Sequence, residues 1–320
     1  MVQGAMHPSC VTIFGGTGFI GRAVVRRLAK LGCVIRIPTR DMDKALPLKP
    51  AGDVGQIVPF LSSLRSEASV AAAVAGADTV INLVGILFES GQNSFQSVHV
   101  ETAARIARIA QRHNVKNFVH LSALGADGNA SSAYARSKAA GEDAVRAFFP
   151  EAVILRPSIV FGPEDNFFNR FAALARFTPA LPLIGGGATR FQPVYVGDVA
   201  EAVVAALTRP EARGQAYELG GPNVYSFREL MTLMLGEVRR KRCLVTLPFG
   251  AAKLQASLLE LLPNPLLTRD QVELLKSDNI LHPQHAKTLR DLGLTPTPLE
   301  TILPTYMDAY RAGGRWGAAA

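Results

Sequence analysis

Three regularly spaced glycines, set between a short apolar run and an amphipathic segment, constrain this chain more than any other feature. Gly15, Gly18 and Gly21 directly follow the β-branched run Val11–Phe14. Apolar residues at helical spacing come next, at Ile20, Val24, Leu28 and Leu31. In such a setting the first glycine permits a sharp turn, the second lets backbone approach a pyrophosphate, and the third lets helix and strand pack closely. The pattern predicts a dinucleotide site at a helix N-terminus, with a ligand-free glycine turn as the alternative.

Short β-branched runs alternate with amphipathic stretches through the first half of the chain. The predicted strands are Val11–Phe14, Val34–Ile37, Thr79–Val84, Phe118–Leu121 and Val153–Leu155. Most are continuous apolar runs, as expected of parallel strands that helices cover on both faces. The sequence therefore predicts an α/β fold with a doubly wound parallel sheet of the Rossmann type.

The character of the sequence changes after Leu155, where prolines and glycines become frequent. We therefore expect an NAD(P)-binding Rossmann domain over residues 1–155 and a smaller C-terminal α/β lobe, for a substrate or partner, over residues 156–320. The strand–turn–helix pattern of Val194–Ala206 predicts that a segment near 192–207 returns to the main sheet.

Composition excludes several classes of protein. With 48% hydrophobic and 19% charged residues among 320, the chain has ample core material and is not mainly disordered. Its three cysteines are scattered without metal-ligand spacing, so we expect no metal site, no disulfide framework and a reducing compartment. The apolar stretch Leu244–Leu267 is interrupted by prolines and charges, so no membrane span is predicted. A first strand near Cys10 leaves no room for a targeting peptide.

The net charge of 34 − 26 = +8 permits anionic partners without choosing among them. No nucleic acid is expected as a partner, because no recognition motif accompanies the basic residues.

The end of the second predicted strand bears on the identity of the nucleotide. Pro38–Asp41 lies about where a ribose-reading residue belongs. Asp41 could accept from a 2′-hydroxyl, which favours NAD(H), whereas Arg40 could pair with a 2′-phosphate, which favours NADP(H). We prefer Arg40 and NADP(H), because Thr39 adds a hydroxyl donor and Asp41 could simply begin the next turn.

A tyrosine and a lysine four residues apart follow the predicted strand Phe118–Leu121. Tyr134 and Lys138 open a predicted helix that continues through Ala140–Ala147, and their spacing puts both on one helix face. A neighbouring ammonium favours phenolate, so we expect the pKa of Tyr134 to be lowered toward a value useful for acid–base chemistry. Lys138 could also hold the nicotinamide ribose.

Together these features resemble the short-chain dehydrogenase/reductase superfamily in its extended, atypical branch, which includes epimerase/dehydratase-like proteins. The matching segments run from about Val11 to Leu219: Gly15–Gly21, Asn82–Gly85, Ser122, Tyr134 with Lys138, Arg156–Pro163 and Gln192–Val199. The resemblance implies a catalytic set of Ser122, Tyr134 and Lys138. It also implies cofactor contacts from Gly15, Thr17, Gly18, Phe19, Ile20, Gly21, Arg40, Leu83, Val84, Gly85, Tyr134, Lys138 and Pro157.

Within that superfamily the chain resembles the nucleotide-binding accessory subunits of respiratory complex I and their bacterial relatives. The segments that carry this likeness are Ile37–Arg40, Phe148–Ala152, Phe161–Asp165, Arg190–Val196, Leu267–Glu273 and Leu292–Leu299. The resemblance implies a tightly held NADPH, complex I subunits as partners, and a structural or assembly role. It further implies a cytoplasmic protein, peripheral on the inner face of a bacterial inner membrane, or on the matrix side in a mitochondrion.

Departures from the superfamily pattern keep other functions open. Residues 58–62 lack the Asp that many relatives carry near the adenine, Ala123 follows Ser122, and His99 stands where many relatives have Asn. We expect His99 to be a packed or hydrogen-bonding histidine. The alternative function is an active NADP-dependent reductase or epimerase/dehydratase that uses Tyr134 as acid–base, Lys138 as its electrostatic partner and Ser122 to orient a carbonyl. A regulator that senses NADPH is a third.

Two features near the C-terminus are not explained by a nucleotide site. The cations Arg239–Arg242 end a predicted helix at Phe227–Val238, where they could cap carbonyls or contact an acidic membrane surface or partner. An apolar stripe at helical spacing follows, formed by Ala251, Leu254, Leu258, Leu261 and Leu262. Such a stripe packs on its own core, on a membrane or on a neighbouring subunit.

Overall fold

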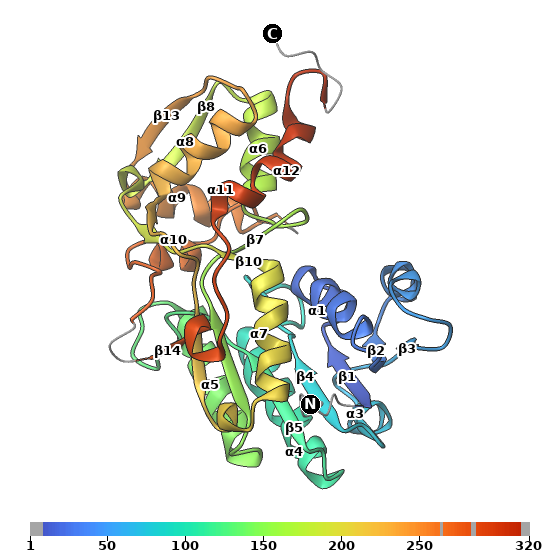
Figure 1. The fold of residues 1–320 in the computed structure, drawn as a ribbon. Coiled ribbons are helices and arrows are strands. Elements are labelled where there is room, and N and C mark those ends of the chain that lie inside the picture. The colour runs from blue at the N-terminus through green and yellow to red at the C-terminus, as the bar shows by residue number, and fades with distance from the viewer. Residues whose placement is uncertain (1–8, 263–264, 283–285, 315–320) are drawn as a thin grey trace. The chain divides into compact units, whose positions relative to one another are not determined.

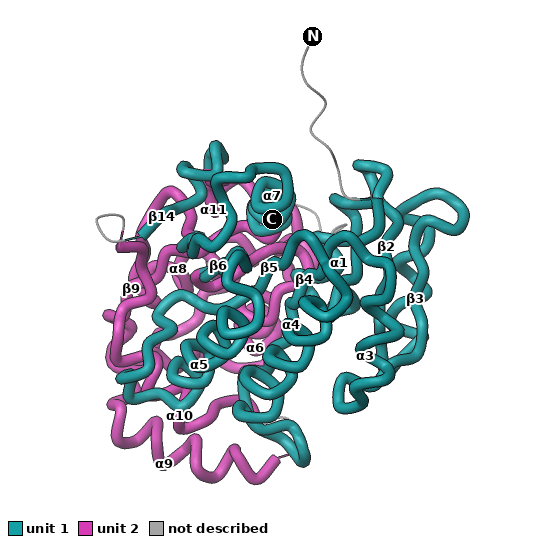
Figure 2. Tube along the Cα trace, turned by 90° about the horizontal axis from the view of Figure 1, so that it is seen from below, with its two compact units in different colours: residues 1–157, 197–219, 283–295 teal, residues 158–196, 220–282, 296–320 magenta. Residues whose placement is uncertain are grey.

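The computed structural model describes residues 9–262, 265–282 and 286–314. The chain forms two compact units, coloured separately in Figure 2. Unit 1 comprises residues 1–157, 197–219 and 283–295, and unit 2 comprises residues 158–196, 220–282 and 296–320. The expected boundary at 155/156, as a limit between independently folding domains, stays a prediction.

Unit 1 is built on an eight-stranded sheet in which every pairing is parallel, in the order β14-β11-β6-β5-β4-β1-β2-β3. Its strands are β1 (Cys10–Phe14), β2 (Val34–Thr39), β3 (Ile57–Leu61), β4 (Thr79–Asn82), β5 (Asn117–Leu121), β6 (Val153–Pro157), β11 (Ala216–Leu219) and β14 (Lys287–Thr288). Central strands such as β4 are buried along their whole length, because helices cover both faces of the sheet. The predicted α/β fold with a doubly wound parallel sheet is confirmed.

Helices lie on both faces of this sheet (Figure 2). On one face are α3 (Glu67–Val74), α4 (Thr102–Arg112) and α5 (Ala133–Phe148), whose apolar side chains form one cluster with the strands. On the other face are α1 (Phe19–Ala29) and α7 (Val196–Thr208), which an Arg27–Glu201 ion pair joins. The short α2 (Met42–Ala45) and the 3₁₀ segment Leu46–Ala51 follow β2.

The strand order reverses at β1, which lies between β2 and β4. In doubly wound sheets, ligands bind beyond the carboxyl ends of the strands at such a reversal point. The predicted glycine loop leaves β1 at this point. The strand predicted over Thr79–Val84 ends at Asn82, so Leu83 and Val84 begin the loop that leaves β4 beside it.

The return of the chain to unit 1 differs in detail from expectation. Residues 197–208 do join unit 1, as α7. The preceding strand β10 (Val194–Tyr195) instead pairs with β7 (Val160–Phe161) in a separate two-stranded sheet. The main sheet is extended by β11, which pairs with β6. A two-residue run followed at once by a helix is too short to form a full sheet strand.

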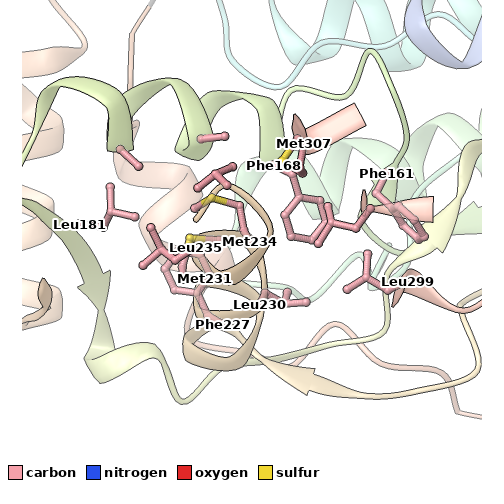
Figure 3. Close-up of a cluster of buried hydrophobic side chains, with 14 of the residues drawn as sticks. Phe161, Phe168, Leu181, Phe227, Leu230, Met231, Met234, Leu235, Leu299 and Met307 are labelled. Carbon is pink, nitrogen blue, oxygen red and sulfur yellow. The ribbon is translucent and has the colours of Figure 1, made fainter. Parts of the chain in front are cut away.

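Unit 2, the smaller of the two units, combines helices with short strands (Figure 1), and Figure 3 shows part of its buried core. Its helices are α6 (Phe168–Phe177), α8 (Phe227–Glu237), α9 (Phe249–Leu259), α10 (Arg269–Leu274), α11 (Leu299–Ile302) and α12 (Pro304–Met307). Besides β7 with β10, it pairs β8 (Ala180–Ile184) with β13 (Cys243–Leu247) and β9 (Arg190–Phe191) with β12 (Tyr225–Ser226). Aromatic and methionine side chains such as Phe168, Phe227 and Met234 form its core. Within the described ranges, no helix has the length and apolar character needed to cross a membrane.

Candidate functional site

The loop after β1 requires glycine at two of its three regularly spaced glycine positions. Gly15 has φ +82°, and a Cβ there would lie 3.0 Å from the carbonyl carbon of Leu83. A Cβ on Gly21 would lie 2.2 Å from the Gly15 oxygen, so the helix could not pack against the loop. Gly18 begins α1 without a side-chain cap and is exposed, and its Cβ would meet only the Gly15 oxygen, at 3.3 Å. The first turn of α1 is therefore open to an anion such as a pyrophosphate.

The loop after β4 is held against the glycine loop by backbone and by Asn82. The Leu83 N–H donates to the Phe14 carbonyl (2.9 Å), and the Val84 N–H donates to the Asn82 amide oxygen (3.2 Å). The Asn82 side-chain nitrogen lies 3.1 Å from Nδ1 of the buried His120. This network fixes the Leu83–Gly85 backbone at the reversal point of the sheet.

Tyr134 and Lys138 lie on consecutive turns at the start of α5, which the Ser132 hydroxyl caps. The Lys138 side chain is buried, and its Nζ donates to the Leu121 carbonyl at 3.2 Å. It lies 6.0 Å from the centroid of the Tyr134 ring. The predicted pair is thus assembled at the end of β5.

Burial governs the protonation of this pair. It lowers the pKa of Lys138 to about 8, an effect that the nearby Glu142 carboxylate partly offsets. It raises the pKa of Tyr134 to about 12. The expectation that Lys138 would lower the pKa of Tyr134 is wrong, because desolvation of the phenolate outweighs the attraction of an ammonium that the Leu121 carbonyl holds. Tyr134 is therefore a neutral phenol at physiological pH.

Ser122 follows β5 and carries a buried hydroxyl. The residue is 3% exposed, and its Oγ has no hydrogen-bond partner among the residues that the structure describes. Its N–H is used within the fold, donating to the Leu155 carbonyl at 2.7 Å. Because buried hydroxyls are normally paired, the Ser122 Oγ fits a position at which a bound ligand supplies the partner.

Arg40 and Asp41 differ sharply in their surroundings. The Asp41 carboxylate caps α2, accepting from the N–H groups of Asp43 (3.1 Å) and Lys44 (3.4 Å), and it forms an ion pair with Lys44. Arg40 is exposed at the end of β2. Thr39 is buried, and its hydroxyl donates to the Asp41 carbonyl.

The structure brings every predicted site residue to the carboxyl ends of five neighbouring strands. Arg40 follows β2, the glycine loop with Thr17, Phe19 and Ile20 follows β1, Leu83–Gly85 follows β4, and Ser122 follows β5. Pro157 ends β6, and its carbonyl accepts from Leu124. Their assigned roles stay predictions. In the described part of the chain, no three His, Cys, Asp or Glu side chains gather as a metal site.

Two side chains at the tyrosine end of the site, Phe95 and Ser137, were not predicted from the sequence. Phe95 lies against the Tyr134 ring at 5.8 Å between centroids. Ser137 donates to the Tyr134 carbonyl at 2.7 Å, three residues back. The position of Ser137 inside the Tyr134–Lys138 segment was the available signal, since serine hydroxyls bond local backbone carbonyls. No pattern in the sequence around Phe95 indicates that it lies against Tyr134.

The two C-terminal features differ: cations of the Arg239–Arg242 run contact the chain's own backbone, whereas the leucines of the apolar stripe are exposed. Arg240 and Arg242 donate to the carbonyls of Tyr310 (3.1 Å) and Ala175 (2.8 Å), so they satisfy backbone of unit 2. The stripe on α9 faces solvent instead: Leu254 and Leu258 are 70% and 66% exposed, while the small Ala252 and Ala256 face the core. We call the exposed side chains of Leu254, Leu258, Leu261 and Leu262 the leucine face.

Comparison with known proteins places the chain among nucleotide-binding proteins. The model of the NAD dependent epimerase/dehydratase family matches residues 11–220. Over 315 residues the chain is 39% identical to NADH dehydrogenase (ubiquinone) 1 alpha subcomplex subunit 9 of Arabidopsis thaliana, covering 95% of this chain and 78% of that protein. It is 34% identical over 302 residues to the NADH-ubiquinone oxidoreductase 40 kDa subunit of Neurospora crassa, covering 94% and 79%.

Solved structures show the same fold. UDP-glucose 4-epimerase of Thermus thermophilus, determined with NAD, superposes with a TM-score of 0.69 at 20% identity, covering 94% of this chain and 98% of that one.

Proposed function

Because the chain belongs to the NAD dependent epimerase/dehydratase family and to the family of complex I 1 alpha subcomplex subunit 9, we propose that it is an NADP(H)-holding accessory subunit of complex I. Its role is structural or in assembly. The observation that carries this proposal is the 39% identity to a complex I subunit across 95% of the chain, which includes unit 2 as well as the nucleotide-binding unit 1.

The preference for NADP(H) rests on the end of β2. Asp41 is already engaged as the cap of α2 and in the Lys44 ion pair, so its carboxylate is poorly placed to accept from a 2′-hydroxyl. Arg40 is exposed beside it, and a guanidinium binds phosphate oxygens through charge-assisted hydrogen bonds. The glycine loop and the first turn of α1 would hold the pyrophosphate.

The protonation states of Tyr134 and Lys138 are consistent with a protein that holds the nucleotide without turning it over. The neutral Tyr134 phenol can donate to a ribose or nicotinamide oxygen, and Lys138 sits one turn further along α5. The active-site hydroxyl of the superfamily could be expected at position 122 or 123, and the chain has Ser122 followed by Ala123, so the catalytic pattern is incomplete at one of these positions. A nucleotide bound only to the folded chain stabilises it by mass action, which is how a cofactor that is not turned over supports assembly.

Attachment to complex I is assigned to unit 2. The leucine face is exposed, and contiguous exposed apolar side chains mark protein-interaction sites. We assign it to an apolar surface of a complex I subunit. The protein would then lie peripherally on the cytoplasmic side of a bacterial inner membrane, or on the matrix side in a mitochondrion.

The proposal is tested by mild-detergent purification of the tagged chain from its native membranes. Co-purifying complex I subunits and releasable NADPH are the expected result, whereas an unpartnered chain would contradict it. The double variant Leu254→Gln, Leu258→Gln should lose the partner subunits and keep its nucleotide. Leu46→Gln, at an exposed leucine of unit 1, is the matched control and should keep both.

A second candidate function, an NADP-dependent reductase or epimerase/dehydratase, is favoured by the unpaired Ser122 hydroxyl. That hydroxyl could orient a substrate carbonyl toward the Tyr134 phenol as proton donor. Bound nicotinamide would supply or accept the hydride. This function predicts that Tyr134→Phe abolishes turnover with nucleotide affinity retained; an unchanged rate would exclude Tyr134 as the acid.

A further inference from the structure

A six-residue π-helical turn, Gln96–Glu101, directly precedes α4 in unit 1. The Thr102 N–H donates to the Ser97 carbonyl five residues back, which is the π-helical spacing, and the Thr102 hydroxyl donates to the same carbonyl at 2.8 Å. Single π-helical turns occur frequently at functional sites. The side chain that this turn directs toward the tyrosine end of the nucleotide site is that of His99.

Both ring nitrogens of His99 are hydrogen-bonded, to two different elements. Nε2 lies 3.0 Å from the N–H of Ile86, which can only donate, so Nε2 is the acceptor. The ring hydrogen is then on Nδ1, 2.8 Å from the Ser137 hydroxyl, whose own hydrogen goes to the Tyr134 carbonyl. His99 therefore joins the loop after β4 to α5 at Ser137.

Packing holds the ring in this position. His99 is 2% exposed, stacks on Phe95 at 5.4 Å between centroids, and meets the Tyr134 ring edge-on at 5.5 Å. A Cβ on Gly141 would lie 2.3 Å from the His99 carbonyl oxygen, so only glycine lets α5 approach the π-helical turn this closely. Side-chain packing and the close approach of the two backbones therefore both hold His99 between the loop after β4 and α5.

The groups facing His99 keep it neutral. Burial, and then the nearby Lys138 ammonium, lower the pKa of His99 to about 3. A protonated ring could not accept from Ile86, so this hydrogen bond is present throughout the physiological range. Gly85 lies against the same two groups: a Cβ there would be in van der Waals contact with Lys138 Nζ (3.4 Å) and His99 Nε2 (3.7 Å).

We propose that His99 is a positioning residue that fixes the distance between the Leu83–Ile86 loop and the Tyr134–Lys138 turn, and so preforms the nicotinamide-riboside end of the nucleotide site. It acts through Ile86 and Ser137 rather than by touching the nucleotide. This inference rests on the proposed nucleotide binding, and deepens it by assigning one end of the site to one side chain.

The test compares two ligands on the full chain, NADPH and 2′-phospho-ADP, which lacks the nicotinamide riboside. His99→Phe keeps a ring against Phe95 and removes both hydrogen bonds. It should weaken NADPH binding about tenfold, with binding of 2′-phospho-ADP changed less than about twofold. His99→Gln, whose amide oxygen can accept from Ile86, should recover part of the NADPH affinity. His113→Phe, at an exposed histidine beyond α4, should change neither affinity.

The outcomes separate this inference from the function on which it rests. An equal loss for both ligands, or no loss for either, would show that His99 has only a structural role and overturn the inference alone. A wild-type chain that binds neither ligand would overturn the proposed function and the inference with it. If His99→Phe does not fold, Ser137→Ala provides the same comparison, with a smaller selective loss for NADPH expected.

Discussion

The two ends of the proposed nucleotide site in unit 1 differ in how they are built. At the proposed phosphate end most of the groups are backbone: the glycines after β1 and the open first turn of α1. The side chain that joins them is the exposed cation Arg40. At the proposed nicotinamide end the groups are buried side chains: Lys138, Ser122 and His99 are each at most 5% exposed. The Arg40 guanidinium is exposed to solvent at the proposed phosphate end, whereas the Lys138 side chain is buried at the other end.

Because the two ends differ in this way, we expect different kinds of substitution to affect them. At the proposed phosphate end a Cβ on Gly15 or Gly21 would crowd the backbone, whereas removal of the exposed Arg40 charge is expected to leave the fold intact. At the nicotinamide end, burial couples binding to protonation and stability, because desolvated groups shift their pKa values.

The largest effect is expected at Gly21, where the phosphate end meets the helix. Gly21→Ala forces a Cβ to within 2.2 Å of the Gly15 oxygen, so the loop must move. We expect loss of measurable NADPH binding and a fall in unfolding free energy of about 1–3 kcal/mol. Gly236→Ala, inside α8 where a Cβ meets nothing within 4 Å, should instead stabilise the chain by about 0.5–1 kcal/mol in the same denaturation assay. Retained NADPH binding in Gly21→Ala would contradict the close-packed loop.

The next effect belongs to the buried end and depends on pH. Burial lowers the pKa of Lys138 from 10.5 to about 8, so between these values the unfolded state binds a proton that the folded state has lost. The unfolding free energy should therefore rise with pH across that window, by about 3 kcal/mol in total, and the full penalty is present below pH 8. Lys138→Met should remove this rise, as measured by denaturant titrations from pH 7 to 10.5.

Lys116→Met, at an exposed lysine, is the control for the general effect of alkaline pH and should preserve the rise. A difference between wild type and Lys138→Met that does not change with pH would show that Lys138 is not desolvated.

Arg40→Ala removes the exposed cation that we propose to pair with the 2′-phosphate. Loss of a guanidinium–phosphate interaction should weaken NADPH binding by about 10–100-fold and leave NADH binding unchanged. Lys30→Ala, at an exposed cation just past α1, should affect neither nucleotide. An equal loss for both nucleotides would assign Arg40 to something other than the 2′-phosphate.

The smallest effect is expected for Asp41→Ala. Removing the cap of α2 should cost about 1 kcal/mol of unfolding free energy and leave the ratio of NADPH to NADH affinity unchanged. A shift of that ratio toward NADPH would mean that Asp41 reads the ribose after all.

Local patterns predicted the phosphate end better than the buried end. The glycine spacing, the apolar strands and the i,i+4 pair at Tyr134 and Lys138 are properties of short segments, so they could be found without the fold. The pKa of Tyr134 could not, because it depends on burial that tertiary packing creates. The bonds of His99 to Ile86 and Ser137 likewise join three segments that are distant in sequence.

The same reasoning applies to the second half of the chain. The apolar stripe on α9 was visible at helical spacing, but its outward direction was not, because alanines rather than leucines face the core of unit 2. Pairing of β10 with β7 was also hidden, since two-residue strands carry no pattern of their own.

We propose that this site holds NADP(H) rather than turning it over. Nucleotide exchange distinguishes the two: the chain, purified with its bound nucleotide, is mixed with an excess of isotopically labelled NADPH, and incorporation is followed over time. A holding subunit should carry one equivalent of NADPH that exchanges over hours or longer. Replacement within seconds would contradict a holding role, and a resident nucleotide without the 2′-phosphate would contradict the preference for NADP(H).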